Sequence, residues 1–123
     1  MLLALTFPFA IVGCSSGGGS ASYEQISGAE AKALMDSKSG YIIIDARTQS
    51  EFDEGHIPGA ILIPEYEIAE RAESELPDKN QLILVYCRSG RRSKIAAEEL
   101  VKLGYTNVKE FGGIIDWKYE IVK

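Results

Sequence analysis

Two short apolar runs constrain the fold of this chain more than any other feature. Residues 41–44 and 82–86 are unbroken stretches rich in β-branched side chains, which is typical of strands covered on both faces. Segments of helical character alternate with the strands along the chain. This alternation predicts a parallel sheet with helices on both faces. We therefore expect an α/β domain whose functional crevice lies beyond the carboxyl ends of its strands.

Capping signals and turn residues place the other elements. Ser27 and Thr48 each stand three residues before a glutamate, a pattern typical of a helix start. The expected helices cover residues 28–37, 48 to about 55, 65–74, the segment after residue 87 to about 103, and 114–120. The other expected strands cover residues 61–63 and 108–111, and Gly112 and Gly113 are expected to form a turn.

Length and charge narrow the range of functions. A chain of 123 residues with 46% apolar side chains can bury one core, and we expect one folded domain from about residue 23. The net charge of −5 argues against a nucleic-acid partner, because there is no excess of cations to release counterions from phosphate. Within residues 88–94, however, the chain gathers the cations Arg88, Arg91, Arg92 and Lys94. This cluster favours a small anionic substrate.

A cysteine lies where the 82–86 strand ends and a helix begins. The polar loop that follows Cys87 consists of Arg88, Ser89, Gly90, Arg91, Arg92 and Ser93. A helix start and nearby cations both favour the thiolate, which is the reactive form of cysteine. A free cysteine is also common as a small core residue, but the loop supplies no apolar side chain to bury it. We therefore expect Cys87 to be an exposed, reactive thiol.

The first residues resemble the leader of a bacterial lipoprotein. Residues 2–12 are apolar and uncharged, and the run is shorter than the about 20 residues that span a bilayer. It ends at Gly13-Cys14, as in a lipobox, although no lysine or arginine precedes it, and a flexible Gly/Ser tract follows. We expect residues 1–13 to be a signal peptide and residues 14–22 a linker. A lipid on Cys14 would then hold the exported domain at the membrane, on the periplasmic or outer cell-surface side.

Lipidation of Cys14 would also determine the redox state of the chain. Cys14 and Cys87 are its two cysteines. With Cys14 acylated, Cys87 would be the one thiol of the mature protein and could form no internal disulfide. A single cysteine in an exported protein indicates a free, reactive thiol.

Several short motifs carry a family resemblance. They are Asp45-Ala46-Arg47, Glu51-Phe52, Gly55-His56-Ile57-Pro58-Gly59-Ala60, the loop from Cys87 to Ser93, Gly112-Gly113-Ile114 and Trp117. In this order and spacing they resemble a single rhodanese domain. The resemblance implies a three-layer α/β fold with a central, mostly parallel, five-stranded sheet flanked by helices. It also implies a sulfurtransferase, in which a cysteine takes the outer sulfur of a donor such as thiosulfate as a persulfide and passes it to a nucleophilic acceptor.

The resemblance also implies roles for the loop residues. Cys87 would be the nucleophile, in covalent catalysis that needs no metal or organic cofactor. The amides of residues 88–93 would form an anion-binding nest, in which Gly90 permits a tight turn. Arg88 and Arg91 are candidates to hold an oxyanionic donor. Arg92 would either orient the loop or neutralise the persulfide, and the sequence does not decide between these roles.

Three residues outside the loop are expected to shape the pocket. Asp45 and Arg47 are interpreted as a partly buried ion pair. His56 lies in a turn and is expected to be structural, although a charge change near neutral pH would let it tune the site. Trp117 is expected to belong to the core.

Two other functions use a similar cysteine. Cysteine-dependent phosphatases and arsenate reductases that resemble rhodanese place five residues between cysteine and arginine, whereas four separate Cys87 from Arg92. The shorter loop suits one sulfur atom better than a tetrahedral oxyanion. A sulfur carrier or polysulfide-binding protein, which hands its sulfur to a dedicated partner, stays open as an alternative. The expected partners are thiosulfate or a polysulfide and a thiol or cyanide acceptor, with no nucleic acid, and the expected state is a monomer.

Overall fold

A single sheet organises the domain. The computed structural model describes residues 22–123. Its strands are β1 (Glu24–Gln25), β2 (Ile42–Asp45), β3 (Ile61–Leu62), β4 (Ile83–Cys87) and β5 (Val108–Gly113). They form a five-stranded sheet in the order β1-β5-β4-β2-β3, in which all neighbouring strands are parallel. The expected α/β fold with a central, parallel, five-stranded sheet is confirmed.

The helices follow the predicted capping signals. They are α1 (Gly28–Ser37), α2 (Gln49–Glu54), α3 (Ile68–Glu75) and α4 (Arg91–Lys102), with short 3₁₀ turns η1 (Glu65–Glu67) and η2 (Ile114–Asp116). At the starts of α1 and α2, the side chains of Ser27 and Thr48 each accept the amide of the glutamate three residues on. Each glutamate carboxylate in turn accepts the amide of its capping residue. Both predicted capping boxes are thus confirmed.

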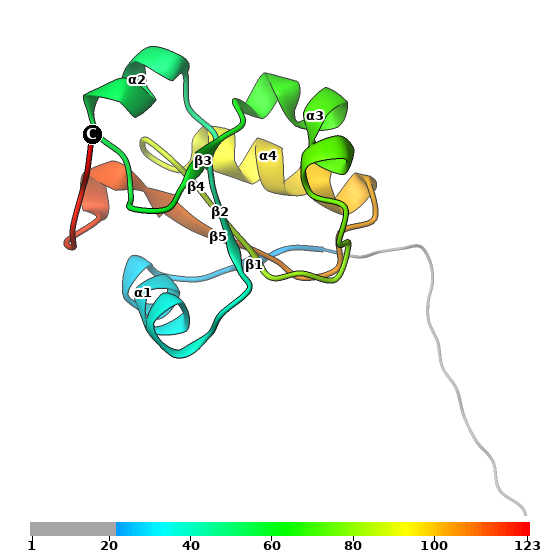
Figure 1. Cartoon of the computed structure of the whole chain (residues 1–123), viewed down its shortest axis with the longest axis horizontal. Coiled ribbons are helices and arrows are strands. Elements are labelled where there is room, and N and C mark those ends of the chain that lie inside the picture. The colour runs from blue at the N-terminus through cyan, green and yellow to red at the C-terminus, as the bar shows by residue number, and fades with distance from the viewer. Residues whose placement is uncertain (1–21) are drawn as a thin grey trace, which may run out of the picture.

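Helices cover both faces of the sheet, as predicted. In Figure 1, α1 lies on one side of the sheet and α3 and α4 on the other. The central strand β4 sends Leu84 and Tyr86 into the buried cluster that includes Ala31 of α1. It sends Val85 and Cys87 into the cluster that includes the buried residues of α3 and α4. Burial on both faces explains why this strand is an unbroken apolar run.

The C-terminal segment differs from the prediction. The helix expected over residues 114–120 is limited to η2, and Gly112 and Gly113 end β5 rather than forming a separate turn. The backbone is extended at Trp117. Farther on, Val122 pairs antiparallel with His56 through two backbone hydrogen bonds of 2.8 and 2.9 Å. Pairing with a distant segment therefore prevails over the local helical pattern.

Some predictions fall outside the described residues. The expected signal peptide, the lipidated Cys14 and nearly all of the linker precede residue 22. Within residues 22–123, no helix has both the length and the apolar character needed to cross a membrane.

Candidate active site

Cys87 occupies the predicted junction between a strand and a helix. It is the last residue of the central strand β4, and α4 begins at Arg91. Gly90 caps α4 with φ +117°, a left-handed conformation that side chains rarely adopt. The chain can therefore turn within residues 88–90 and start α4 four residues after the end of β4.

The thiol of Cys87 is more enclosed than the sequence suggested. We expected an exposed thiol, and this prediction is wrong, because Cys87 is only 1% exposed. The polar loop folds back over the sulfur, and the Gly90 amide donates a hydrogen bond of 3.0 Å to Sγ. The sulfur is therefore buried against hydrogen-bonding groups of the loop as well as against the core.

The loop rests on the end of β5. Cys87 pairs with Gly113, across an irregularity of the ladder in which β5 contributes an extra residue. The carbonyl of Arg88 lies directly over Gly113 and accepts the amide of Ile115 at 3.2 Å. A Cβ atom on Gly113 would lie 1.9 Å from that carbonyl oxygen. Residue 113 must therefore be glycine for the loop to take this position.

A buried serine and a buried glutamate stand behind the thiol. Ser93 Oγ lies 3.4 Å from Cys87 Sγ and 2.5 Å from a carboxylate oxygen of Glu110. The same oxygen of Glu110 accepts the Gly112 amide at 2.9 Å, and the other accepts the Gln25 side-chain amide at 3.3 Å. Glu110 is 1% exposed. Sequence reasoning included Ser93 in the loop but missed Glu110, whose signal is a lone carboxylate in a buried strand.

Arg92 is held by a carboxylate from another helix. Its guanidinium donates two hydrogen bonds, of 2.8 and 2.9 Å, to the two carboxylate oxygens of Glu51 on α2. This pairing lowers the pKa of Glu51 from 4.5 to about 2. It also raises the pKa of Arg92. The pair ties the start of α4 to α2, which favours the loop-orienting role among the two that the sequence left open.

The other loop side chains face solvent. Arg88, Ser89 and Arg91 are exposed. Within residues 22–123, no hydrogen bond or ion pair engages the guanidinium groups of Arg88 or Arg91. Both groups are therefore available to a small anion at the loop.

Asp45 and Arg47 form the predicted ion pair, but the pair is fully rather than partly buried. The Arg47 guanidinium donates to both oxygens of Asp45 and, at 2.7 Å, to the carbonyl of Gly55. The Tyr86 hydroxyl donates a hydrogen bond of 2.7 Å to Asp45. The pKa of Tyr86 is raised, mainly by burial and to a smaller extent by the negative charge of Asp45. Tyr86 points to the sheet face opposite that of Cys87. The Asp45–Arg47 pair thus holds Tyr86, the residue before Cys87, and does not contact the thiol itself.

His56 has structural contacts. Its ring stacks on Phe52 with centroids 3.7 Å apart, and Nδ1 lies 2.9 Å from the Phe52 carbonyl, to which it must donate. Its backbone pairs with Val122. None of these contacts reaches the loop. The ring centroids of Trp117 and Phe111 lie 5.6 Å apart. Trp117 packs against the buried cluster that includes Ala31 of α1, in line with the expected core role.

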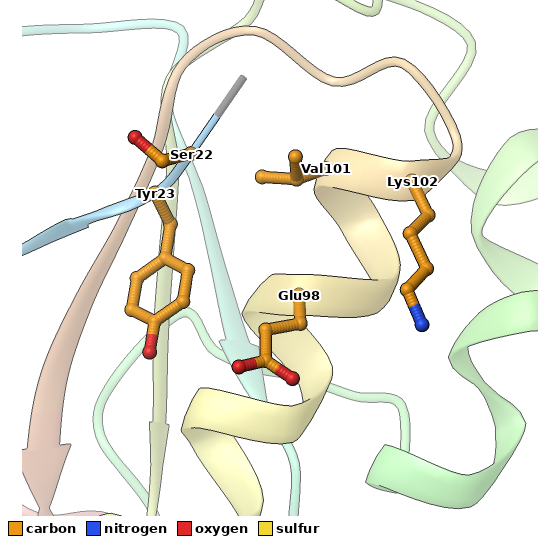
Figure 2. Close-up of a pocket in the computed structure, with 5 residues that line it drawn as sticks. All are labelled: Ser22, Tyr23, Glu98, Val101 and Lys102. Carbon is orange, nitrogen blue, oxygen red and sulfur yellow. The ribbon is translucent and has the colours of Figure 1, made fainter. Parts of the chain in front are cut away.

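A separate pocket of about 320 Å³ is lined by Ser22, Tyr23, Glu98, Val101 and Lys102 (Figure 2). Tyr23 precedes β1 and Val101 lies in the last turn of α4, so this pocket is at the end of the sheet away from Cys87. No predicted site residue lines it. Within residues 22–123, no group of three or more histidine, cysteine or acidic side chains could hold a metal ion.

Comparison with known proteins places the fold and the loop in a family. Residues 27–120 match the family model described as a rhodanese-like domain. The chain is 44% identical over 73 residues to thiosulfate sulfurtransferase PspE of Escherichia coli (strain K12), covering 59% of this chain and 70% of that protein. It is 37% identical over 97 residues to thiosulfate sulfurtransferase GlpE of Coxiella burnetii (strain RSA 493 / Nine Mile phase I), covering 78% of this chain and 88% of that protein.

A solved structure agrees with these relatives. The structure described as rhodanese with anions from E. coli superimposes with a TM-score of 0.64 at 41% identity, over 68% of this chain and 98% of that chain. The family match covers nearly all of the described domain, including the Cys87 loop and Gly113. The chain belongs to the rhodanese-like domain family.

Proposed function

We propose that this protein is a sulfurtransferase that moves a sulfane sulfur from a small anionic donor to a thiophilic acceptor. The donor is thiosulfate or a polysulfide, and the acceptor is a thiol or cyanide. The observation that carries this proposal is the position of Cys87 Sγ, which accepts the Gly90 amide at the start of α4. The similarity to proteins named thiosulfate sulfurtransferase supports the reaction class.

The proposed reaction consists of two displacements at sulfur. The Cys87 thiolate attacks the outer sulfur of thiosulfate, the S–S bond of the donor breaks, and sulfite leaves with the bonding electron pair. Cys87 then carries a persulfide whose terminal sulfur is anionic. The acceptor attacks this terminal sulfur, and the thiolate leaves again. Cys87 forms a covalent bond to sulfur in the first step and releases it in the second, which is covalent catalysis.

The charges around the loop suit an anionic donor and an anionic intermediate. The helix start and the Gly90 amide stabilise negative charge on the sulfur. The proposed role of the exposed guanidinium groups of Arg88 and Arg91 is to hold the sulfonate end of the donor by charge-assisted hydrogen bonds. Arg92 is engaged by Glu51, and its proposed role is to fix the loop.

Thiocyanate formation tests the nucleophile. The purified domain is incubated with thiosulfate and then with cyanide, and thiocyanate is measured for the wild type and for Cys87→Ser. We expect release from the wild type alone. Equal release from both proteins would rule out Cys87 as the nucleophile. A mass gain of one sulfur without thiocyanate would favour the sulfur carrier over the enzyme.

A second comparison tests the arginines. Arg88→Ala is expected to raise the KM for thiosulfate by about tenfold, which corresponds to the loss of one charge-assisted hydrogen bond. The cooperative melt should be unchanged, because the side chain is exposed. Lys102→Ala, which removes an exposed cation from the far end of α4, is the matched control and should leave the KM unchanged. A lost melt in Arg88→Ala would contradict the proposed role.

We further propose that the protein is exported and held at the membrane by a lipid on Cys14, and that it acts there as a monomer. Support for the anchor comes from the leader sequence, in which Cys14 follows an apolar run and precedes a Gly/Ser tract. The intact mass of protein extracted from membranes tests the anchor. We expect a chain that begins at an acylated Cys14, and an unacylated, uncleaved N-terminus would refute the anchor.

A further inference from the structure

A buried thiol needs a route for its proton. Cys87 is 1% exposed, so the residue is almost entirely shielded from solvent. Two polar groups within residues 22–123 contact Sγ. They are the Gly90 amide, which can only donate, and the Ser93 hydroxyl at 3.4 Å. Ser93 Oγ is therefore the atom in position to accept the thiol proton.

The Ser93 hydroxyl has a single proton, and its geometry indicates where that proton lies. Oγ is 3.0 Å from the Gly90 carbonyl and 3.4 Å from the Gly112 carbonyl, but only 2.5 Å from Oε2 of Glu110. A hydroxyl donates most strongly to a carboxylate at such a distance. With its proton directed to Glu110, Ser93 offers a lone pair to the S–H group of Cys87. The three side chains thus form a chain of hydrogen bonds from the sulfur to a carboxylate.

Glu110 is poorly suited to be a mere structural residue. A carboxylate in a buried strand carries a large desolvation cost unless it is fully hydrogen-bonded. The carboxylate accepts three hydrogen bonds, from Ser93, Gly112 and Gln25, yet no ion pair within residues 22–123 involves it. An apolar side chain would fill this core position at lower cost. The retained carboxylate therefore calls for a role that an apolar residue could not fill.

We propose that Glu110 takes up the proton of Cys87 through Ser93 when the thiol becomes a nucleophile. This inference deepens the proposed sulfur transfer and rests on it for its substrate. Ser93 is the proton shuttle, and Glu110 is a positioning residue that acts on the sulfur through Ser93.

The proton movements balance over one turnover. In the first half-reaction, the thiol proton passes to Ser93 Oγ, and the Ser93 proton passes to Glu110. The thiolate attacks thiosulfate, and the products are the anionic persulfide, sulfite and a neutral Glu110 carboxylic acid. The neutral acid then donates to Ser93, which leaves Ser93 free to donate to the persulfide. When the acceptor removes the outer sulfur, the two protons return, and Glu110 is again a carboxylate.

Other charged groups lie around Glu110. Lys94 Nζ and Glu110 Oε2 are both 3.9 Å from the position that a Cβ of Gly90 would take. On the β1 side, the charge of Glu110 contributes to a raised pKa of Tyr23, after burial and Glu98. None of these side chains contacts Sγ. They therefore offer the thiol no second proton acceptor.

Alkylation of Cys87 by iodoacetamide tests the relay independently of any sulfur donor. The alkylation rate is measured across pH for the wild type, Glu110→Gln and Ser93→Ala. The ratio of the rate near neutral pH to the rate at alkaline pH is compared, because a change in the access of iodoacetamide to the sulfur affects both rates alike. Glu98→Gln removes a carboxylate of α4 outside the network and is the matched control. Thermal melts report whether each variant is folded.

The relay predicts that Glu110→Gln lowers this ratio by about 10²-fold, the usual contribution of an internal base. Ser93→Ala should lower the ratio to the same extent, and combining it with Glu110→Gln should lower the ratio no further. Glu98→Gln should leave it unchanged. If Glu110 were only a fixed negative charge, its removal would favour the thiolate and raise the ratio, which would overturn the relay. An unchanged ratio in either folded variant would overturn it as well.

The two proposals can fail separately. A wild type that forms no thiocyanate but shows the predicted alkylation ratios would refute the sulfur transfer and keep the relay. A wild type that forms thiocyanate while Glu110→Gln alkylates like the wild type would refute the relay alone. Should one variant not fold, the other still decides, because each removes one member of the same hydrogen-bond chain.

Discussion

At the scale of single residues, Gly113 controls the position of the Cys87 loop. A methyl group on Gly113 would overlap the Arg88 carbonyl at 1.9 Å, so Gly113→Ala must displace the loop. We expect thiocyanate formation to fall by about 100-fold, as for a misplacement of about 1 Å in a catalytic group. The free energy of unfolding should fall by about 1–3 kcal/mol, as in other overpacked sites. Steady-state kinetics and denaturant unfolding measure the two effects.

The matched control for this substitution is Gly40→Ala. Gly40 has φ +75° with open space around the Cβ position, so the variant carries the backbone strain without a collision. It should lose about 1 kcal/mol of stability and no activity. Equal losses of activity in both variants would show that strain, and not the contact with Arg88, is responsible.

The Asp45–Arg47 pair yields a second prediction at this scale. Asp45→Asn leaves the Arg47 guanidinium buried without its charge partner, and the free energy of unfolding should fall by about 3–5 kcal/mol. Since the contacts of the pair lie on the face opposite Cys87, the folded variant should keep its kcat. Denaturant unfolding and thiocyanate assays test both parts. A folded variant with a greatly reduced kcat would instead support the expected role of the pair in shaping the pocket.

At the scale of elements, the pair between Glu51 and Arg92 links α2 to α4. The pKa of Glu51 is lowered from 4.5 to about 2, so the pair stabilises the fold above pH 4.5 and loses this effect as the pH falls to about 2. Glu51→Gln should lower the free energy of unfolding by about 1–2 kcal/mol near neutral pH. This value is smaller than the full pKa shift would give, because solvent screens two partly exposed side chains. The difference from the wild type should vanish at the acid end of this range.

Unfolding by urea at several pH values measures this dependence. Asp36→Asn, which breaks the exposed pair with Lys32 on α1, is the control and should have a negligible effect at any pH. A Glu51→Gln variant whose deficit persists below pH 2 would show that packing of the side chain, rather than its charge, ties α2 to α4.

The elements also show what the sequence could and could not predict. The central strands and the capped helices are encoded locally, in the apolar runs and in Ser27 and Thr48, and they were predicted. The strand β1 is a pair of polar residues, Glu24 and Gln25, and it exists only because β5 offers an edge to pair with. The segment after Asp116 has a helical pattern, yet its pairing with His56 keeps it extended.

The same distinction applies to the candidate site. Cys87, its loop and the exposed arginines are consecutive in the sequence and could be identified from it. Glu51 and Glu110 lie 41 and 17 positions from their partners Arg92 and Ser93, so no local pattern connects them. The burial of the thiol depends on the approach of the loop to Gly113, which is also a contact between distant segments.

At the scale of the whole molecule, the sheet separates two kinds of buried polar network. Cys87, Ser93 and Glu110 lie toward α4, whereas Asp45, Arg47 and the His56 turn lie with Tyr86 on the other side. The C-terminal segment closes the second side, through the pairing of Val122 with His56 and the hydrogen bond from Trp117 Nε1 to the Glu120 carbonyl. Stability and sulfur chemistry should therefore respond to different substitutions.

Val122→Pro tests this separation. The substitution removes the amide that donates to the His56 carbonyl at 2.9 Å, and the free energy of unfolding should fall by about 1 kcal/mol or slightly more. Lys123→Pro is the control, because proline there keeps residue 122 extended and removes none of the hydrogen bonds to His56. Both variants should alkylate Cys87 at the wild-type rate, since the hydrogen bonds of residue 122 go to His56 and not to the loop. If Val122→Pro instead accelerated alkylation while the protein stayed folded, the two faces of the sheet would be coupled, and the access of reagents to Cys87 would depend on the whole domain.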